Sequence, residues 1–271
     1  MVMNDMQAQL DFAIAIAKHA GTIMRDYYDR AEKGIQRKAD ESPVTIADKL
    51  INNYLIEQVA VHFPKHGVLG EEASTMTAEH VDVWVCDPID GTIPFIMGIP
   101  TAMFSLALVH NGEPLIGVSY DPFMDRIFTA VKGKGAYCNG KPVHVSDRTL
   151  ENRAIVAGPS YPDGLLRAVS LYEGLKAHGA YITMFPGNVY KCSLIADGRI
   201  DGRIFSGPYA HDIAAIKVIV EEAGGRVTDL DGNEQRYDGR ITGAIISNGH
   251  IHEALVNAVK GFGGPEKVMA V

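Results

Sequence analysis

The chain has 271 residues, of which 46% are apolar, and a formal net charge of −8. No apolar run reaches the ~18 residues that a membrane-spanning helix needs, and the acidic balance disfavours a basic surface for nucleic acid. We therefore expect a soluble protein of one large domain or two joined subdomains, with no membrane segment and no direct nucleic-acid contact.

The cysteines and the N-terminal residues indicate the cellular compartment in which the protein is expected. Cys86, Cys138 and Cys192 are odd in number and form no CxxC pair, so they indicate neither a disulfide framework nor a zinc site. The first residues lack a basic segment followed by an apolar one, which is the pattern of a secretory signal. Both features predict a cytoplasmic protein.

Two helices followed by a run of strands are predicted for the first half of the chain. Helical periodicity predicts one helix over residues 7–30 and a second that begins after Thr45, runs through Val59 and is ended by residues 63–67. Strands are then expected over residues 68–70, 81–86, 102–110, 115–120, 126–131 and 136–145. The Asn-Gly pairs at residues 111–112 and 139–140 favour tight hairpin turns. So many consecutive strands predict a mainly antiparallel or mixed sheet.

A polar break at residues 146–149 is the predicted boundary between a subdomain of residues 1–147 and one of residues 148–271. Beyond it, helices are expected over residues 165–178, 190–196, 213–223 and 252–260. Strands are expected over residues 154–157, 181–184, 200–205, 226–229 and 244–247. Asp212 is predicted to be the N-cap of the helix that starts at Ile213.

The most informative segment is residues 87–92, which read DPIDGT. An apolar run leads into it and predicts a strand that ends in a cleft. Asp87, Asp90 and a backbone carbonyl there can bind hard cations, and Gly91 with Thr92 can open a helix whose first amides face an anion. The same residues are also good turn formers. The segment alone therefore predicts either a turn or a metal-assisted phosphate site.

Four other acidic or hydroxyl residues are of interest, and two of them, Glu71 and Asp212, have two interpretations each. Glu71 follows a predicted strand. It is either a solvated acid or a metal ligand and general-base partner. Asp212 can cap its helix and still lend an oxygen to a cation. Thr45 and Asp48 suit the start of a helix as its cap and as a partner of its dipole.

Three nitrogen-bearing side chains could contact a substrate. We expect Lys191 and Arg203 to be solvated, and His211 to lie in a plain loop or to be packed. The chain contains no GxxxxGK[ST], GxGxxG or HExxH sequence, so a nucleotide-binding loop and a zinc-protease site have no support.

Four motifs, in this order, resemble those of the inositol monophosphatase family of magnesium-dependent, lithium-sensitive phosphomonoesterases. They are TIAD at residues 45–48, GEE at 70–72, DPIDGT at 87–92, and DIAA at 212–215 with EAGG at 222–225. The sequences KGA at residues 134–136 and NG at 139–140 are similar as well. The resemblance therefore spans nearly the whole chain.

The resemblance implies an α+β fold, a layered αβαβα sandwich of the inositol monophosphatase / fructose-1,6-bisphosphatase type, with the active site between two subdomains. It also implies two or three Mg²⁺ ions. Glu71, Asp87 and the carbonyl of Ile89 would hold the first ion. Asp87, Asp90 and Asp212 would hold the second, and a third, weaker ion would again use Glu71. Such oxygen ligands suit Mg²⁺ better than zinc.

The same resemblance implies the catalytic and substrate-binding residues. Thr92, paired with Asp48, would help Glu71 to orient and deprotonate the attacking water. The amides of Gly91 and Thr92 would receive the phosphate. The other implied substrate-binding positions are Asp90, Gly187, Asn188 and Phe205. A homodimer that acts on a small-molecule phosphate monoester is implied as well.

Several positions depart from the family pattern, namely residues 93–95, residues 187–189, His211 in place of a common tryptophan, and Phe205. Inositol-hydrolysing members place a sugar-contacting glutamate at the position of Phe205, which offers no hydrogen bond to a polyol hydroxyl. An aromatic ring there suits an imidazole or an adenine, or else simple packing. Inositol monophosphate remains the first predicted substrate. Histidinol phosphate, fructose 1,6-bisphosphate and 3′-phosphoadenosine 5′-phosphate are alternatives, and a binding role toward the transcription machinery is an alternative of another class.

Overall fold

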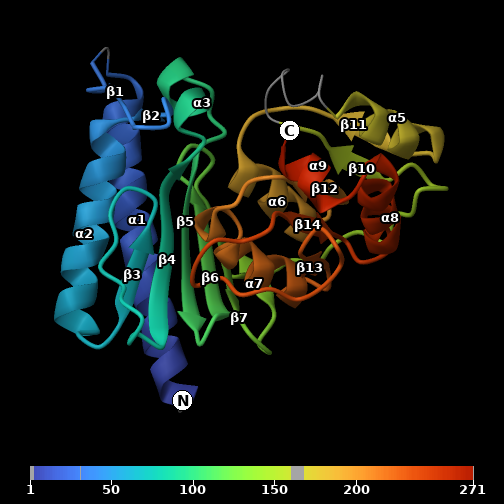
Figure 1. Cartoon of the computed structure of the whole chain (residues 1–271). Coiled ribbons are helices and arrows are strands. Elements are labelled where there is room, and N and C mark those ends of the chain that lie inside the picture. Colours follow the sequence, from blue (N-terminus) through green and yellow to red (C-terminus); the bar gives the residue numbers. More distant parts are fainter. Residues whose placement is uncertain (1–2, 31, 160–167, 271) are drawn as a thin grey trace.

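Helices and sheets alternate in layers along the molecule (Figure 1). The computed structural model describes residues 3–30, 32–159 and 168–270. The helices in these ranges are α1 (Met3–Tyr28), α2 (Ile46–His62), α3 (Thr92–Met97), α5 (Val169–Ala177), α6 (Asn188–Ala196), the 3₁₀ helix η1 (Ala210–Asp212), α7 (Ala214–Glu222), α8 (His252–Phe262) and α9 (Pro265–Met269).

The strands in these ranges form a two-stranded hairpin and two larger sheets. The hairpin consists of β1 (Gln36–Arg37) and β2 (Pro43–Val44). The first large sheet contains β3 (Gly67–Gly70), β4 (Asp82–Asp90), β5 (Met103–His110), β6 (Glu113–Asp121), β7 (Arg126–Val131), β8 (Ala136–Cys138) and β9 (Lys141–Pro142). The second contains β10 (Ile155–Ala157), β11 (Tyr181–Thr183), β12 (Gly202–Phe205), β13 (Arg226–Thr228) and β14 (Ala244–Ser247).

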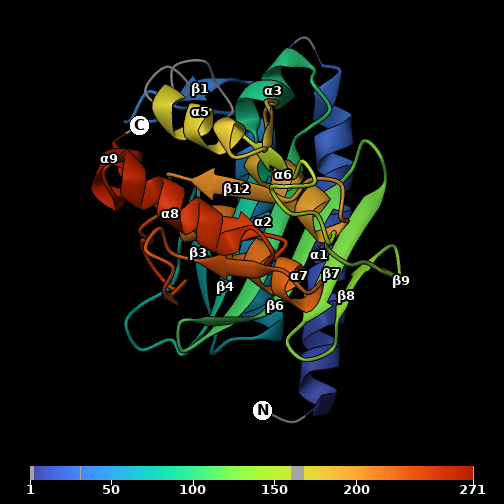
Figure 2. The same ribbon diagram turned by 90° about the vertical axis from the view of Figure 1, so that its right-hand side faces the viewer.

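Five layers result from the packing of these elements. α1 and α2 cover one face of the first large sheet, and α6 and α7 lie between the two large sheets. α5 and α8 pack on the outer side of the second sheet, and Figure 2 views the molecule from that side. The structure therefore confirms the predicted α+β fold with αβαβα layers. Buried apolar side chains of the described residues form three clusters. One lies between α1, α2 and the first large sheet, one surrounds α6 and α7 between the two large sheets, and one lies between the second large sheet and α5 and α8.

The first large sheet follows the order of the sequence. Its strands run β3-β4-β5-β6-β7-β8-β9, and every neighbouring pair except β3 with β4 is antiparallel. Asn111 and Gly112 join β5 to β6 with φ angles of 49° and 85°. Positive φ at both central positions is what a tight type I′ hairpin requires. The predicted hairpin is therefore confirmed.

The second large sheet has the order β11-β10-β12-β14-β13. β10 pairs in parallel with both β11 and β12, whereas β14 pairs antiparallel with β12 and β13. The prediction of mainly antiparallel or mixed sheets is confirmed, because the first sheet is mainly antiparallel and the second is mixed.

Several boundaries differ from the sequence-based expectations. The strand predicted over residues 81–86 continues to Asp90, so most of the DPIDGT segment lies inside β4. The strand predicted over residues 136–145 is divided into β8 and β9. The hairpin of β1 and β2 was not predicted, because two-residue strands are too short to show a period of two. Helix α9 was not predicted either. The helix expected over residues 165–178 begins outside the described residues, and its described part is α5.

No helix among the described residues is long and apolar enough to cross a membrane. The described strands of the first large sheet all precede residue 143, and those of the second all follow residue 154. The division into residues 1–147 and 148–271 remains our proposal, and this distribution of strands is compatible with it.

Candidate functional site

Asp87 and Asp90 lie close together because β4 carries an extra residue between them. Asp87 pairs with Ser105 of β5 and Asp90 pairs with Met103, so three steps along β4 match two along β5. In a regular strand, residues three positions apart point to opposite faces. The bulge restores a common side for the two carboxylates, and both are almost completely buried.

A third carboxylate comes from Asp212 in η1. The ligand oxygens of Asp87, Asp90 and Asp212 all lie within 4.8 Å of one another. The prediction that Asp212 caps α7 is wrong, because the N-cap is Ile213 and Asp212 ends the 3₁₀ turn before it. This turn leaves the Asp212 carboxylate free of capping, and the side-chain amide of Asn188 donates to it at 3.2 Å.

Burial and mutual repulsion raise the pKa of all three carboxyl groups. The pKa of Asp87 lies well above its usual range, first through burial and then through the nearby charge of Glu71. Burial and Asp212 raise the pKa of Asp90 to about 8, and burial raises the pKa of Asp212. An ionised cluster of this kind is costly without positive charge beside it. Its all-oxygen ligands fit a hard divalent cation.

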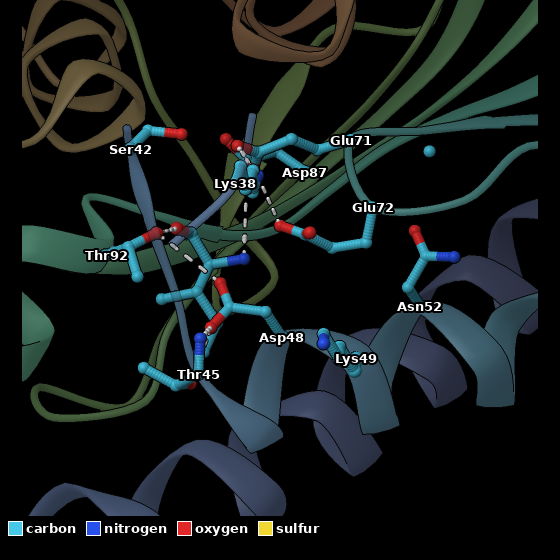
Figure 3. A network of polar contacts seen from close by, with 12 residues as sticks. Lys38, Ser42, Thr45, Asp48, Lys49, Asn52, Glu71, Glu72, Asp87 and Thr92 are labelled. Atoms are coloured by element: carbon cyan, nitrogen blue, oxygen red, sulfur yellow. Dashed lines mark hydrogen bonds and ion pairs between the residues drawn. The ribbon is translucent and has the colours of Figure 1, made fainter. Parts of the chain in front are cut away.

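Glu71 lies next to this cluster and forms an ion pair with Lys38 (Figure 3). Nζ of Lys38 is 2.7 Å from Oε1 of Glu71 and 2.7 Å from Oε1 of Glu72. Burial alone would lower the pKa of Lys38, but the two carboxylates outweigh it and raise that pKa. Lys38 directly follows β1, and no motif or periodicity in the sequence indicated that it reaches the site.

Asp48 connects the start of α2 to Thr92. Its Oδ2 accepts the backbone amide of Thr45 at 2.8 Å and the hydroxyl of Thr45 at 2.5 Å, which confirms Thr45 as the helix cap. Its Oδ1 lies 3.4 Å from the hydroxyl of Thr92 (Figure 3). The same hydroxyl is 3.2 Å from the carbonyl oxygen of Ile89. Burial raises the pKa of Asp48 to about 7.

Two glycines shape the helix N-termini beside the carboxylates. Gly91 precedes α3 with a φ of +84°, a conformation that favours glycine. Gly187 precedes α6 with a φ of +93°, and a Cβ there would lie 2.5 Å from the carbonyl oxygen of Thr101. Two residues after Gly187, the backbone amide of Val189 donates to Oδ2 of Asp90 at 2.9 Å. Asp90 therefore links β4 to the first turn of α6.

The predicted solvation of Lys191 and Arg203 is wrong, because their exposed fractions are 0% and 5%. Both side chains donate to the carbonyl of Gly158, at 3.0 Å and 3.2 Å respectively. Arg203 also donates to the side-chain carbonyl of Asn188. Burial and then the charge of Arg203 lower the pKa of Lys191 to about 6. Arg203 thus orients Asn188, which in turn contacts Asp212.

A cleft of about 670 Å³ opens beside the carboxylates. The predicted site residues Glu71, Asp87, Ile89, Asp90, Gly91, Thr92, Gly187, Asn188, Phe205 and Asp212 all line it, whereas Asp48 lies behind Thr92. Apolar side chains line the cleft as well, among them Ala168, Leu171, Tyr172, Phe205 and Val268. The cleft therefore combines carboxylates with apolar side chains. His211 also lines it, at the end nearest Glu71 and Asp87.

The chain is similar to known proteins over nearly its whole length. Residues 5–262 match the pattern of the inositol monophosphatase family. The chain is 32% identical to inositol monophosphatase 3 of Solanum lycopersicum over 92% of this chain and 96% of that protein. It is 31% identical to a histidinol-phosphatase of Chlorobaculum parvum, over 94% and 97% of the two chains. It is 30% identical to the Nus factor SuhB of Pasteurella multocida, over 94% of each chain.

A solved structure resembles the whole architecture. The IMPase of Thermotoga maritima superimposes with a TM-score of 0.84 at 28% identity, and the match covers 96% of this chain and 99% of that one.

Proposed function

The chain belongs to the inositol monophosphatase family, whose members are phosphatases that hydrolyse phosphate monoesters, and we propose that the carboxylate cleft is its active site. The observation that carries this proposal is the convergence of Asp87, Asp90 and Asp212, three buried acids within 4.8 Å of one another. Burial and neighbouring carboxylates raise their pKa values, so the ionised cluster needs further positive charge beside it. Bound cations would supply that charge.

Divalent cations, Mg²⁺ first among them, are the proposed cofactors. Glu71, Asp87 and the carbonyl of Ile89 would hold one ion. Asp87, Asp90 and Asp212 would hold a second, and a weaker third would again use Glu71. When bound, such ions neutralise a phosphate dianion, acidify the attacking water and stabilise the leaving alkoxide.

The chain's own residues would position the reactants. Thr92 can donate its hydroxyl proton to Asp48, which leaves the lone pairs of the Thr92 oxygen to accept a hydrogen bond from water. Glu71, which is only half-buried, would take the proton of that water as a general base. An ionised Asp48 accepts this hydrogen bond more strongly than a protonated one, which connects catalysis to the pKa of a buried acid.

The phosphate would be received between α3 and α6. The first amides of a helix have no carbonyl partner within it, so those of Gly91 and Thr92 can face an anion. Gly187 and Asn188 line the same cleft, and the Cα of Gly187 lies 3.7 Å from the place of a Cβ on Gly91. We assign both residues to the substrate as well. Asp90, fixed by the amide of Val189, would both hold a cation and border the substrate.

The substrate has two leading candidates. Inositol 1-phosphate is the first, because relatives over nearly the whole chain are inositol monophosphatases. The apolar lining that includes Phe205 favours the second, a phosphate monoester whose leaving group carries a flat ring, such as histidinol phosphate with its imidazole. Phe205 is 5% exposed and has no hydrogen-bonding group for a polyol hydroxyl.

The test is phosphate release from a panel of monoesters. Inositol 1-phosphate, histidinol phosphate, fructose 1,6-bisphosphate and 3′-phosphoadenosine 5′-phosphate are each incubated with purified protein, with and without Mg²⁺. We expect Mg²⁺-dependent release from at least one of them, and the fastest reaction identifies the leaving group. If none of the four monoesters releases phosphate, the proposal that this cleft is a phosphatase site for such substrates is refuted.

Three further properties are inferred from the family and from the composition. We expect Li⁺ to inhibit the reaction, the protein to form a homodimer, and the reduced cytoplasm to be its compartment. The similarity to a protein named Nus factor SuhB keeps a partner in the transcription machinery as a second role. A pull-down with the Asp87→Asn variant distinguishes this second role from the phosphatase role. Partner binding that survives in a variant without turnover belongs to the second role.

A further inference from the structure

His211 occupies a special place in the cleft. It immediately precedes Asp212 in η1, and its side chain is 12% exposed. One of its ring nitrogens lies within 4.8 Å of a carboxylate oxygen of Glu71 and of one of Asp87. These three side chains form another potential metal cluster, which shares Asp87 with the group of Asp87, Asp90 and Asp212.

The surroundings hold the imidazole in place without using its nitrogens. The ring stacks on Tyr209 with centroids 5.2 Å apart and an angle of 11° between the planes. Nε2 is 3.9 Å from Oδ2 of Asp212, which is beyond hydrogen-bond distance. Across residues 3–30, 32–159 and 168–270, no side chain or backbone group forms a hydrogen bond with either ring nitrogen of His211. The imidazole is therefore oriented by packing and keeps a lone pair available.

We propose that His211 supplies a nitrogen ligand to the cation that Glu71 and Asp87 hold, and that it shifts this cation site toward transition metals. The inference rests on the cation site proposed above and adds to it a ligand and a metal preference. In an octahedral site, two ligands about 2.1 Å from the ion lie about 3.0 Å apart when adjacent and about 4.2 Å apart when opposite. The three groups lie within 4.8 Å of one another, so they need to approach by at most about 1.8 Å, which rotation of the side chains can provide.

The chemistry of the donor determines the preference. Imidazole suits Zn²⁺, Ni²⁺ and iron, whereas Mg²⁺ prefers oxygen and binds an imidazole weakly. A neutral nitrogen also adds no negative charge to a site that is already strongly acidic. The second site, made of Asp87, Asp90 and Asp212, has oxygen ligands alone and keeps its preference for Mg²⁺. The two sites of one cleft would then differ in the metal that each prefers.

The inference is tested by spectroscopy of the metal alone, without substrate. Mn²⁺ is titrated into the metal-free protein from half an equivalent to saturation, and pulsed electron paramagnetic resonance detects nitrogen bonded to the ion. We expect ¹⁴N modulation in the wild type, its replacement by a ¹⁵N pattern when the histidines are labelled with ¹⁵N, and its loss in His211→Gln. The labelled wild type keeps the test valid even if the variant folds poorly.

The matched control is His110→Gln, which changes a half-exposed histidine paired with Asp82. Both residues lie at the end of the β4–β5 pair opposite to Asp87 and Asp90. Calorimetric titrations of Ni²⁺ and Mg²⁺ accompany the spectra. The ratio of Ni²⁺ to Mg²⁺ affinity is expected to fall about 10-fold or more in His211→Gln and to stay unchanged in the control. Mn²⁺ binding without nitrogen modulation in the wild type, or modulation that persists in His211→Gln, refutes the ligand assignment alone. Failure of every cation to bind refutes the proposed active site together with it.

Discussion

The hydroxyl of Thr92 lies 3.4 Å from Oδ1 of Asp48, across 44 residues of sequence. The other oxygen of Asp48 is already engaged by the amide and the hydroxyl of Thr45. Asp48 is therefore fixed by the cap of α2 and presents one oxygen to the start of α3. Because Thr92 also lies 3.2 Å from the carbonyl of Ile89, its single proton can serve only one of these acceptors at a time.

Substitution of Thr92 tests whether this contact serves catalysis. Thr92→Val keeps the shape of the side chain and removes the hydroxyl, so we expect kcat to fall about 10²-fold or more, as for loss of a group that positions a proton transfer, with a small change in KM. Thr92→Ser keeps the hydroxyl and is the matched control, expected to remain within about 10-fold of the wild type. Steady-state kinetics on the best substrate of the panel measures both. Equal activities of the two variants would contradict a role for the hydroxyl.

The buried acids predict an unusual pH dependence of stability in the cation-free protein. Their folded-state pKa values are raised, to about 7 for Asp48 and about 8 for Asp90. Between the usual carboxyl pKa and these values, each of these acids binds more protons in the native protein than in the unfolded chain, so its contribution to stability falls as the pH rises. Lys191, whose pKa is lowered to about 6, contributes in the opposite direction, but it is one group against several acids. We expect the Tm of chelator-treated protein to drop by a few degrees between pH 6 and pH 8. Thermal unfolding followed by circular dichroism measures this change.

Mg²⁺ should abolish that decrease. Cations hold the carboxylates ionised, and binding at 100 times Kd adds about 2.7 kcal/mol to the free energy of unfolding. The Tm at pH 8 should therefore rise with Mg²⁺ more than the Tm at pH 6 does. Asp90→Asn removes one of the titrating groups and should flatten the decrease in the cation-free protein. A cation-free Tm that increases from pH 6 to pH 8 would contradict the raised pKa values.

The position of Lys38 leads us to expect that its ammonium group competes with a cation for Glu71. Its Nζ lies 2.7 Å from both Glu71 and Glu72, so its ammonium group competes with a cation for the carboxylate of Glu71. We expect Lys38→Met to tighten the weakest Mg²⁺ site by about 10-fold, because removal of the ammonium leaves two carboxylates unpaired. Isothermal titration calorimetry gives the stoichiometry and the affinity.

The control for this titration is Lys49→Met, since Lys49 is an exposed lysine that contacts Gln36 (Figure 3 shows it beside Asp48). It removes the same charge from the protein without touching Glu71. Weaker Mg²⁺ binding in Lys38→Met than in Lys49→Met would show that the ammonium supports the cation site instead of competing with it.

Substitution of Phe205 tests whether the cleft favours leaving groups with a flat ring. Phe205→Leu retains an apolar side chain in the buried position and removes the aromatic ring. A ring contact contributes about 0.5–1.5 kcal/mol, so kcat/KM for a substrate with a flat ring should fall about 3- to 10-fold. A small phosphate monoester without a ring is the internal control and should be hydrolysed at an unchanged rate. Equal losses for both substrates would indicate that Phe205 only packs.

Much of this site could be predicted because its residues belong to local motifs. The carboxylates of Asp87 and Asp90 are three positions apart, Glu71 ends a strand, and Thr45 with Asp48 forms a capping pattern. Each of these signals lies within a few residues of sequence. Their convergence in one cleft was inferred from the family resemblance, and the metal and catalytic roles remain proposals.

The remaining features depend on contacts that no local pattern encodes. Lys38 reaches Glu71 through a hairpin whose strands have two residues each. Arg203 was expected in solvent, but it is buried against the carbonyl of Gly158 and the side chain of Asn188. Asp212 was expected to cap a helix, and one 3₁₀ turn decides otherwise. In each case the tertiary environment overrides what the residue type alone favours.

The central claim is that Asp87 is shared by the cations of a phosphatase site, and Asp87→Asn tests it most directly. The substitution keeps the shape of the side chain and removes its charge, whereas Asp82→Asn makes the same change at the start of the same strand, outside the cleft. We measure phosphate release against Mg²⁺ concentration for the wild type and both variants, on the best substrate of the panel. The account predicts a loss of about 10³-fold or more in kcat for Asp87→Asn, with an intact fold by circular dichroism, and near-normal turnover for Asp82→Asn. Near-normal, Mg²⁺-dependent turnover by Asp87→Asn would contradict it.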